Sequence, residues 1–211
     1  SGEISYQDSE EIKAFIGHIA TQIKEKYRPK TVLDAGCAMG LLVAALRDLG
    51  VEAYGVDLSE YAISQVREDI RPYCAVGSLA DPLPDSLPRR YDLVVSMEVL
   101  EHIPEEEGKK AVANLCAVTD QVLFCSSPDD TEDPTHINLH QPSYWCGLFA
   151  EQGFFFVGEE KPVFLTNYAL FFRQKNVPAA VELYEKKLQN YEEQVLQLSL
   201  DLDEIQEKNE V

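Results

Sequence analysis

The sequence predicts an α/β fold, in which a sheet of seven strands is flanked by helices. Short apolar runs alternate along the chain with segments whose apolar residues recur at helical spacing, which is typical of this class. A glycine-bearing turn, 36–40, directly follows the first apolar run and precedes a helical pattern, as in a strand, loop and helix unit. With 211 residues, of which 45% are hydrophobic, the chain is long enough to bury the core of one such domain.

The first half of the chain supplies three helices and four strands. A helix is predicted over 8–27, where Arg28-Pro29 ends a pattern of apolar residues at steps of three and four. A second helix is predicted over 41–46, after the turn. A third is predicted over 60–67, because the Ser59 hydroxyl can accept a hydrogen bond from a free amide of the first turn. Apolar runs predict strands at 31–33, 53–56, 72–76 and 91–96.

The second half supplies two helices and three strands. An amphipathic pattern predicts a helix over 105–118, and a helix over 143–153 is expected to begin at a serine cap and end at a glycine. A polar loop, 126–140, precedes this second helix. Apolar runs predict strands at 121–125, 154–158 and about 163–173.

The turn 36–40 has the composition of a cofactor loop. A dinucleotide-binding fingerprint would need glycine at positions 36, 38 and 41, and the chain has glycine only at the first of these. A phosphate-binding P-loop is excluded, because no Gly-Lys-Ser/Thr follows. Asp57 lies about 20 residues beyond the turn, where a carboxylate at a strand end can accept hydrogen bonds from ribose hydroxyls. A glycine turn and an acidic strand end also occur in α/β domains that bind no cofactor.

Three segments resemble the class I S-adenosylmethionine-dependent methyltransferases. Val-Leu-Asp-Ala-Gly-Cys-Ala-Met-Gly (32–40) is similar to that family's first motif, Tyr-Gly-Val-Asp-Leu-Ser (54–59) to its ribose-binding loop, and 91–102 to its fourth motif. The resemblance implies a Rossmann-like, mostly parallel seven-stranded sheet in which one of the last two strands is antiparallel. The sequence departs from the family at Ala38, where many members carry glycine, and at Ser78, where many carry aspartate.

The same resemblance implies S-adenosylmethionine as the cofactor and a set of residues around it. The cofactor-binding residues implied are Asp34, Gly36, Cys37, Gly40, Asp57, Leu58, Ser78, Leu79 and Met97. Segments such as Tyr-Trp-x-x-Leu-Phe-Ala (144–150) are also similar to methyltransferase modules of bacterial multidomain glycan-assembly proteins. That similarity implies a glycan or nucleotide-sugar substrate, and fused domains beyond this sequence.

Two histidines are candidates for the base that removes a hydroxyl proton from the substrate. His136 lies in the polar loop beyond the end of a strand, where open parallel sheets bind ligands, and His102 follows the fourth strand. Histidine titrates near neutral pH, which suits a general base. The alternative is that these histidines only form structural hydrogen bonds, and His140 is a weaker candidate than His136.

A metal site is a further alternative. Glu98, Glu101 and His102 stand at i, i+3 and i+4, so in a helix they would share one face. Carboxylates and imidazole can bind a divalent ion, and the small-RNA 2′-O-methyltransferases use a similar arrangement. Many related O-methyltransferases carry Glu-His here without the motif itself implying a metal. We therefore expect no divalent metal, and assign these residues to helix capping and to the polar side of the substrate site.

Methyl transfer requires little covalent chemistry from a protein. The sulfonium is an activated donor, so aligning an acceptor lone pair behind the methyl carbon supplies most of the rate. The polar, histidine-bearing loop favours transfer to a hydroxyl of a sugar or glycan. Two alternatives remain open: a quinone-type or other small-molecule O-methyltransferase, and a non-catalytic methyltransferase-like scaffold that acts through its C-terminal helix.

The composition changes from Pro178 onward. Apolar residues repeat there at alternating steps of three and four with polar residues between them, which predicts a coiled coil. A single long helix packed on its own domain is the alternative. We therefore expect a lead-in over 1–7 whose first two residues resemble a cloning scar, a methyltransferase domain over 8–177, and a coiled-coil helix over 178–211 that forms a homo-oligomer.

The charge balance restricts the partners. Eighteen Lys and Arg against 37 Asp and Glu leave a formal net charge of -19, which disfavours nucleic acids and anionic membranes. The five cysteines form no Cys-x-x-Cys pair, as expected for free thiols in a reducing compartment, so we expect a cytoplasmic protein. We find no signal peptide or membrane-spanning run in the sequence, and the expected partner is a small-molecule or glycan substrate.

Overall fold

The computed structural model describes residues 9–175. The chain divides into two units, 1–174 and 175–211. The predicted coiled coil over 178–211, the oligomer it would form and the lead-in over 1–7 all lie outside the described residues. Within the described part, none of the helices has both the length and the apolar character needed to cross a bilayer.

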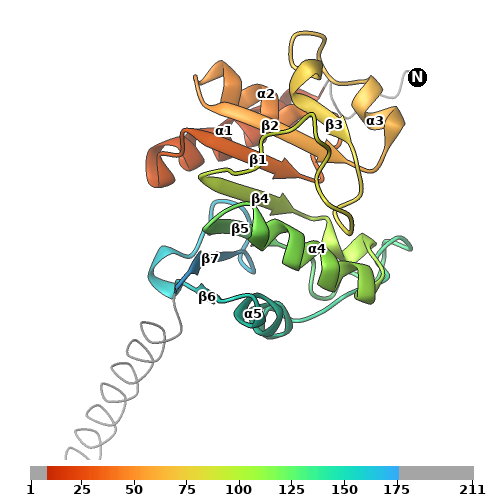
Figure 1. The fold of residues 1–211 in the computed structure, drawn as a ribbon, viewed down its shortest axis with the longest axis vertical. Coiled ribbons are helices and arrows are strands. Elements are labelled where there is room, and N and C mark those ends of the chain that lie inside the picture. The colour runs from red at the N-terminus through yellow and green to blue at the C-terminus, as the bar shows by residue number, and fades with distance from the viewer. Residues whose placement is uncertain (1–8, 176–211) are drawn as a thin grey trace, which may run out of the picture. The chain divides into compact units, whose positions relative to one another are not determined.

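The described strands form one seven-stranded sheet in the order β3-β2-β1-β4-β5-β7-β6 (Figure 1). The strands are β1 (Thr31–Ala35), β2 (Glu52–Asp57), β3 (Cys74–Val76), β4 (Leu93–Met97), β5 (Gln121–Cys125), β6 (Phe154–Phe156) and β7 (Leu170–Gln174). β7 runs antiparallel to both of its neighbours, β5 and β6, and the other neighbouring pairs are parallel. This arrangement confirms the predicted mostly parallel sheet with one antiparallel strand.

Helices cover both faces of the sheet (Figure 1). One face carries α1 (Glu10–Tyr27), α2 (Leu41–Asp48) and α3 (Glu60–Ser64), and the other carries α4 (Glu105–Ala117) and α5 (Pro142–Glu151). All five helices were predicted, but the expected serine cap of α5 is wrong, because Gln141 occupies its N-cap and no side chain caps it. Ser59 caps α3 as expected, because its hydroxyl accepts a hydrogen bond from the Ala62 amide at 3.1 Å. α3 ends at Ser64, earlier than predicted.

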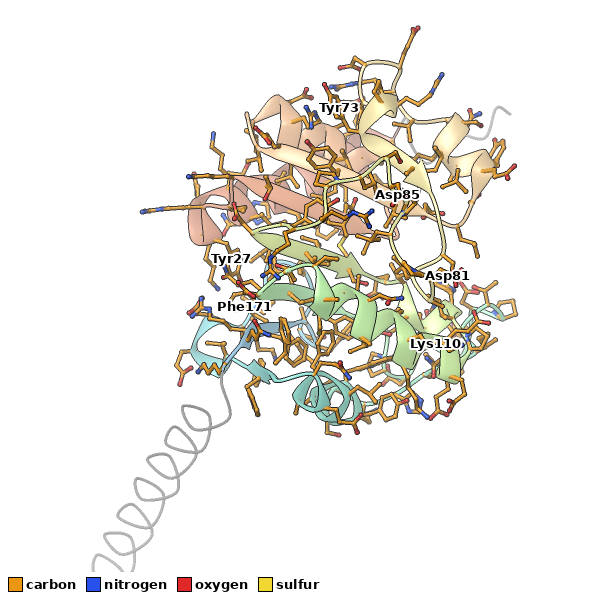
Figure 2. All side chains as sticks on the ribbon, viewed as in Figure 1. Tyr27, Tyr73, Asp81, Asp85, Lys110 and Phe171 are labelled. Atoms are coloured by element: carbon orange, nitrogen blue, oxygen red, sulfur yellow. The ribbon has the colours of Figure 1, made fainter. Side chains whose placement is uncertain are left out.

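The core consists of two apolar layers because successive residues of a strand point to opposite faces. In β4, Leu93 and Val95 pack with α1 and α2, whereas Val94 packs with α4 and α5. Tyr27, at the end of α1, packs on Phe171 of β7 with 4.7 Å between ring centroids (Figure 2). Each fully buried aliphatic side chain contributes roughly 1.5–3 kcal/mol, so the central strands hold the loops that follow them in fixed positions.

The third strand begins later than predicted. Residues Arg71–Tyr73 form a short 3₁₀ helix, and only Cys74–Val76 pair with β2. Pro72 has no amide proton for a strand ladder and sits in the first turn of this 3₁₀ helix instead. The Arg47 guanidinium lies 3.2 Å from the centroid of the Tyr73 ring and covers it.

The last strand is also shorter than the predicted 163–173. β7 begins at Leu170, and the segment before it forms turns in which the Leu165 amide donates to the Pro162 carbonyl at 2.9 Å. These turns bury Leu165 and Ala169 in the core beside α1 and α2. As a result, Leu165 and Thr166 reach the edge of the sheet where the site lies.

Candidate active site

The site lies at the carboxyl edge of the sheet, at the point where the strand order reverses between β1 and β4. Open α/β sheets bind ligands at such a point, because the loops after the two central strands diverge there. Two adjoining hollows of about 330 Å³ each occupy this edge, and both are lined by Gly36, Ala38 and Glu98. Together they have the size of a small-molecule site.

The two hollows differ in the other residues that line them. The first hollow is also lined by Phe15, Ile16, Asp34, Cys37, Met39, Leu41, Leu42, Met97, Leu165 and Thr166. The second hollow is also lined by Asp57, Leu58, Gly77, Ser78, Leu79, Val99, His102, Ile103, Pro104 and Glu107. Eight of the nine predicted cofactor-binding residues line one hollow or the other, and only Gly40 lines neither.

The turn between β1 and α2 requires glycine at its first position. Gly36 has φ +88, and a Cβ placed there would lie 2.3 Å from Cγ2 of Val99. Ala38 also adopts the left-handed region, with φ 45, which costs about 1–2 kcal/mol for a residue with a Cβ. Its amide donates to Oδ2 of Asp57 at 2.8 Å, and this charge-assisted hydrogen bond offsets the cost.

Asp57 joins the turn to the second hollow. Its Oδ1 accepts from the Ser59 amide at 2.8 Å, and its Oδ2 accepts from Ala38. An ionised carboxylate has about four acceptor positions, so two remain for ribose hydroxyls. Leu58 is 74% exposed at the wall of the same hollow, and Leu79 is buried there. A flat apolar group bound in this hollow would cover the exposed leucine.

Asp34 lies at the first hollow with a side chain that is almost completely buried. Burial, and then the charge of Asp57, raises the pKa of Asp34 to about 7. A cation bound in the first hollow would favour the ionised form and lower this pKa. Asp34 is therefore suited to hold a positively charged ligand group.

Cys37 and Gly40 shape the loop by packing and backbone geometry. The Cys37 thiol lies over Gly55, where a Cβ would be only 2.6 Å from its sulfur. A hydrogen bond with Cys74, together with burial, raises the pKa of Cys37, so this thiol stays protonated at neutral pH. Gly40 adopts φ 70 and accepts the first helical hydrogen bond of α2 from the Ala44 amide, which fixes where that helix begins.

Ser78 and Met97 lie where the motif resemblance places them. Ser78 lines the second hollow, and its hydroxyl oxygen accepts from the Ala80 amide at 3.1 Å. Because a hydroxyl oxygen has two lone pairs, one remains for a donor on a ligand. Met97 ends β4 and lines the first hollow.

The two candidate histidines lie side by side. The rings of His102 and His136 have centroids 4.7 Å apart. His102 lines the second hollow, but His136 does not contribute to either hollow of the described chain. Nδ1 of His136 donates to the Asp130 carbonyl at 2.7 Å, and this hydrogen bond is the main cause that raises the pKa of His136. His140 instead stacks on Tyr144, with ring centroids 3.6 Å apart.

The structure brings together a different set of possible metal ligands from the set that the sequence spacing suggested. The structure groups three possible ligand atoms within 4.8 Å of one another, one from each of Glu101, His102 and His136. Glu98 is not part of this group, because residue 98 has φ 54 and only Leu100–His102 form a short 3₁₀ helix. The Glu101 carboxylate is fully buried and accepts from the Ser126 hydroxyl at 2.9 Å.

Glu98 was expected on the polar side of the substrate site, but its contact with Tyr168 was not predicted. Its Oε2 accepts from the Tyr168 hydroxyl at 3.0 Å, across 70 positions of sequence, and its Oε1 is buried without a hydrogen-bond partner within residues 9–175. Oγ1 of Thr166, which lines the first hollow, is also buried with no partner in this part of the chain. The spacing of Glu98, Glu101 and His102 suggested a shared face, and no local pattern indicated the contact with Tyr168.

The chain belongs to the methyltransferase domain family, whose pattern matches residues 6–157. Among curated relatives, it is 31% identical over 98 residues to the magnesium-protoporphyrin O-methyltransferase of Synechocystis sp., covering 45% of this chain and 43% of that protein. It is 33% identical over 104 residues to the ubiquinone biosynthesis O-methyltransferase of Methylococcus capsulatus, covering 46% of this chain and 43% of that protein. The chain thus spans less than half of the length of each of these two relatives.

The fold agrees with solved structures. The crystal structure of magnesium protoporphyrin IX methyltransferase from Synechocystis PCC 6803 with bound SAH superposes with a TM-score of 0.62, at 18% identity, over 83% of this chain and 90% of that chain. The PH0226 protein from Pyrococcus horikoshii OT3 superposes with a TM-score of 0.61, at 18% identity, over 82% of this chain and 95% of that chain. These likenesses support the α/β methyltransferase fold.

Proposed function

We propose that the chain binds S-adenosylmethionine and transfers its methyl group to a hydroxyl of a small, ring-bearing molecule of the quinone-precursor type. The observation that carries this proposal is the pair of joined hollows at the switch point of a methyltransferase-family domain, with Asp34 in one and Asp57 in the other. The cofactor would thread past Gly36 and Ala38, which line both hollows.

Each half of the cofactor has matching groups. The amino-acid end would lie in the first hollow, where the Asp34 carboxylate can balance the ammonium charge. The ribose hydroxyls would donate to Asp57, and the adenine would lie between Leu58 and Leu79 in the second hollow. The Ser78 hydroxyl is available for the adenine amino group. This assignment uses the predicted cofactor residues without rearranging the loop.

The substrate class rests on the relatives and on the walls of the first hollow. The two relatives are named for O-methyl transfer to a porphyrin and in ubiquinone biosynthesis. Phe15 and Leu165 supply apolar walls at the first hollow, which suit a ring better than a sugar. The small-molecule alternative therefore has more support than the sugar or glycan reading, and the relatives give no support for a glycan-assembly module or for a scaffold without activity.

Catalysis by this site would rely on alignment. The sulfonium supplies an activated methyl group when the cofactor is bound, and the loop holds it in place while the acceptor oxygen approaches. No divalent metal is assigned to this step, although Glu101, His102 and His136 offer ligand atoms beside the second hollow. A cytoplasmic location stays a prediction.

Isothermal titration calorimetry with S-adenosylhomocysteine tests the cofactor assignment. We expect binding to the full chain and, for Asp57→Ala, a weakening of about 100-fold, because charge-assisted hydrogen bonds to the ribose and to Ala38 are lost. Asp85→Ala is the matched control: Asp85 is exposed and forms an ion pair with Arg89, away from both hollows, so its removal should leave the affinity unchanged. Absence of heat with the unmodified chain would refute the proposed function. Repeating the titration in EDTA should give the same affinity, and a loss there would assign a metal to the site.

A further inference from the structure

Glu98 is held in a strained position at the junction of the two hollows. It follows β4 with φ 54, a left-handed backbone conformation that is unfavourable for a residue with a side chain. The backbone is held there by a hydrogen bond of 3.0 Å from the Glu98 amide to the Cys125 carbonyl. Glu98 is one of three residues that line both hollows.

The two oxygens of this carboxylate have different environments. Oε2 accepts from the Tyr168 hydroxyl at 3.0 Å, whereas Oε1 is buried and has no partner among the described residues. A buried carboxylate oxygen without a hydrogen bond is costly, and a catalytic role is one of the physical reasons for which native structures keep such a group. Oγ1 of Thr166 is a second buried and unpartnered polar atom of the first hollow.

Burial, and then the charge of Glu101, raises the pKa of Glu98, while contacts with the Cys125 thiol and the Tyr168 hydroxyl lower it in part. A raised carboxyl pKa brings the group closer to neutral pH, where a general base is most effective. Glu101 itself is unavailable for this role, since its carboxylate is fully buried and accepts hydrogen bonds from Ser126 and Ser127.

We propose that Glu98 accepts the proton of the acceptor hydroxyl, with Thr166 as a second contact to the acceptor and Tyr168 as the residue that positions the Glu98 carboxylate. This inference rests on the proposed function. In the step, the acceptor O–H bond breaks and its proton passes to Glu98, while an oxygen lone pair forms the new bond to the methyl carbon. The carbon–sulfur bond breaks and its electron pair stays on sulfur, which leaves a neutral thioether.

The chemistry of the base selects the class of acceptor. A phenol has a pKa near 10, so a carboxylate with a raised pKa can take its proton as the methyl group is transferred. A sugar hydroxyl holds its proton far more tightly. The apolar side chains Phe15 and Leu165 line the same hollow and can pack against the ring of a phenol. The acceptor assigned to this hollow is therefore a phenol, and a dihydroxyphenyl compound is the suitable probe.

Tyr168 has a separate, measurable role. Its hydrogen bond stabilises the ionised form of Glu98, so it lowers the Glu98 pKa against the effect of burial. Removing the hydroxyl in Tyr168→Phe should raise that pKa and move the acidic limb of the rate profile to higher pH. A residue that only filled space would not change the pH profile.

The test uses 3,4-dihydroxybenzoate and S-adenosylmethionine with the full chain, and measures methyl transfer from pH 5 to 9. We expect Glu98→Gln to lower kcat about 10²–10⁴-fold and to remove the acidic limb, while the affinity for S-adenosylhomocysteine stays within threefold. Tyr168→Phe should move the acidic limb to higher pH. Thr166→Val should raise KM about tenfold, because a contact to the acceptor is lost. Glu151→Gln, at an exposed position of α5, is the control and should behave like the unmodified chain.

The outcomes separate this inference from the proposed function. Full activity of Glu98→Gln would refute the role of Glu98 and leave the proposed function intact. A large loss of S-adenosylhomocysteine binding in Glu98→Gln would make Glu98 a cofactor ligand and also refute its role as base. If the cofactor-loaded chain neither methylates the probe nor binds it by calorimetry, the phenol assignment is wrong, although cofactor binding would still support a methyltransferase.

Discussion

At the residue scale, the turn between β1 and α2 depends on Gly36 for two reasons that can be separated by mutation. Gly36 and Gly50 both have φ above +80, but a Cβ at Gly36 meets Val99 at 2.3 Å, whereas a Cβ at Gly50 meets nothing within 4 Å. Gly50→Ala should therefore cost only the left-handed backbone, about 1–2 kcal/mol.

We expect Gly36→Ala to cost about 1–3 kcal/mol more than Gly50→Ala, because overpacking adds to the backbone term. It should also weaken S-adenosylhomocysteine binding at least tenfold, since the turn must shift. Urea unfolding and calorimetry on the two variants measure both effects. Equal destabilisation by the two substitutions would show that the contact with Val99 is relieved at little cost.

The buried carboxylate of Asp34 should have opposite effects on the stability of the folded chain and on cofactor binding. Its pKa is raised from 3.8 to about 7 in the folded chain, so this group favours the folded state most below pH 4, and the benefit is lost as the pH rises through 7. Asp34→Asn removes the buried charge. The free energy of unfolding of the cofactor-free variant should exceed that of the unmodified chain by about 1–4 kcal/mol at pH 8, and by much less at pH 5.

The same substitution should weaken S-adenosylhomocysteine binding, because the ammonium group loses its counter-charge. Urea unfolding at the two pH values and calorimetry at pH 8 check both halves of the prediction. If Asp34→Asn destabilises the chain at pH 8, the buried carboxylate has stabilising partners that outweigh its desolvation.

Sequence spacing located some site residues well and failed for others, for a physical reason. Asp34, Gly36 and Asp57 belong to local strand-end motifs, and each lies where the motif suggests. The Glu98–Tyr168 contact joins β4 to the segment before β7, 70 positions further on, so only the folded sheet creates it.

At the element scale, hydrogen bonds of Asp92 connect β1 and β4 at the edge of the sheet opposite the site. Its Oδ2 accepts from the amides of Lys30 and Thr31 at 2.7 and 3.1 Å, and its own amide donates to Oγ1 of Thr31 at 3.0 Å. These contacts tie the start of β1 to the start of β4.

Asp92→Ala should lower the free energy of unfolding by about 1–2 kcal/mol, since hydrogen bonds to a carboxylate are lost at a partly solvated position. S-adenosylhomocysteine affinity should not change, because the cofactor hollows lie at the other end of the strands. Asp92→Asn keeps one acceptor oxygen and should lose less. Urea unfolding measures the change in stability, and calorimetry measures the affinity. A large loss of affinity would show that the register of these strands controls the site.

The elements themselves were predictable where the pattern was local. β1, β4 and β5 are buried on both faces and appear in the sequence as apolar runs. The predicted start of β3 was wrong because Pro72 has no amide proton for the strand ladder and begins a 3₁₀ helix instead. The predicted start of β7 was wrong because tertiary packing, which buries Leu165 and Ala169, forms turns before Leu170. The same turns bring Thr166 to the first hollow, so the missed boundary and the missed site residue have one cause.

At the scale of the whole molecule, the predicted coiled coil over 178–211 leads to a prediction about assembly. A narrow apolar stripe buries itself best against a second helix, so we expect the full chain to form a homo-oligomer and a chain ending at residue 177 to be a monomer. Light scattering on the two proteins measures the masses. The shortened chain should keep its S-adenosylhomocysteine affinity, because every residue assigned to the cofactor lies within 34–97.

The charge of the chain makes this assembly depend on salt. Each copy carries a formal net charge of -19, so association brings like charges together and is opposed by their repulsion. Raising the ionic strength from about 0.01 M to 0.15 M shortens the screening length from about 30 Å to about 8 Å, and should therefore tighten the oligomer. Sedimentation at the two salt concentrations would show a shift toward the oligomer at the higher one. Identical masses for the full and shortened chains at both concentrations would contradict the coiled coil and favour a helix packed on its own domain.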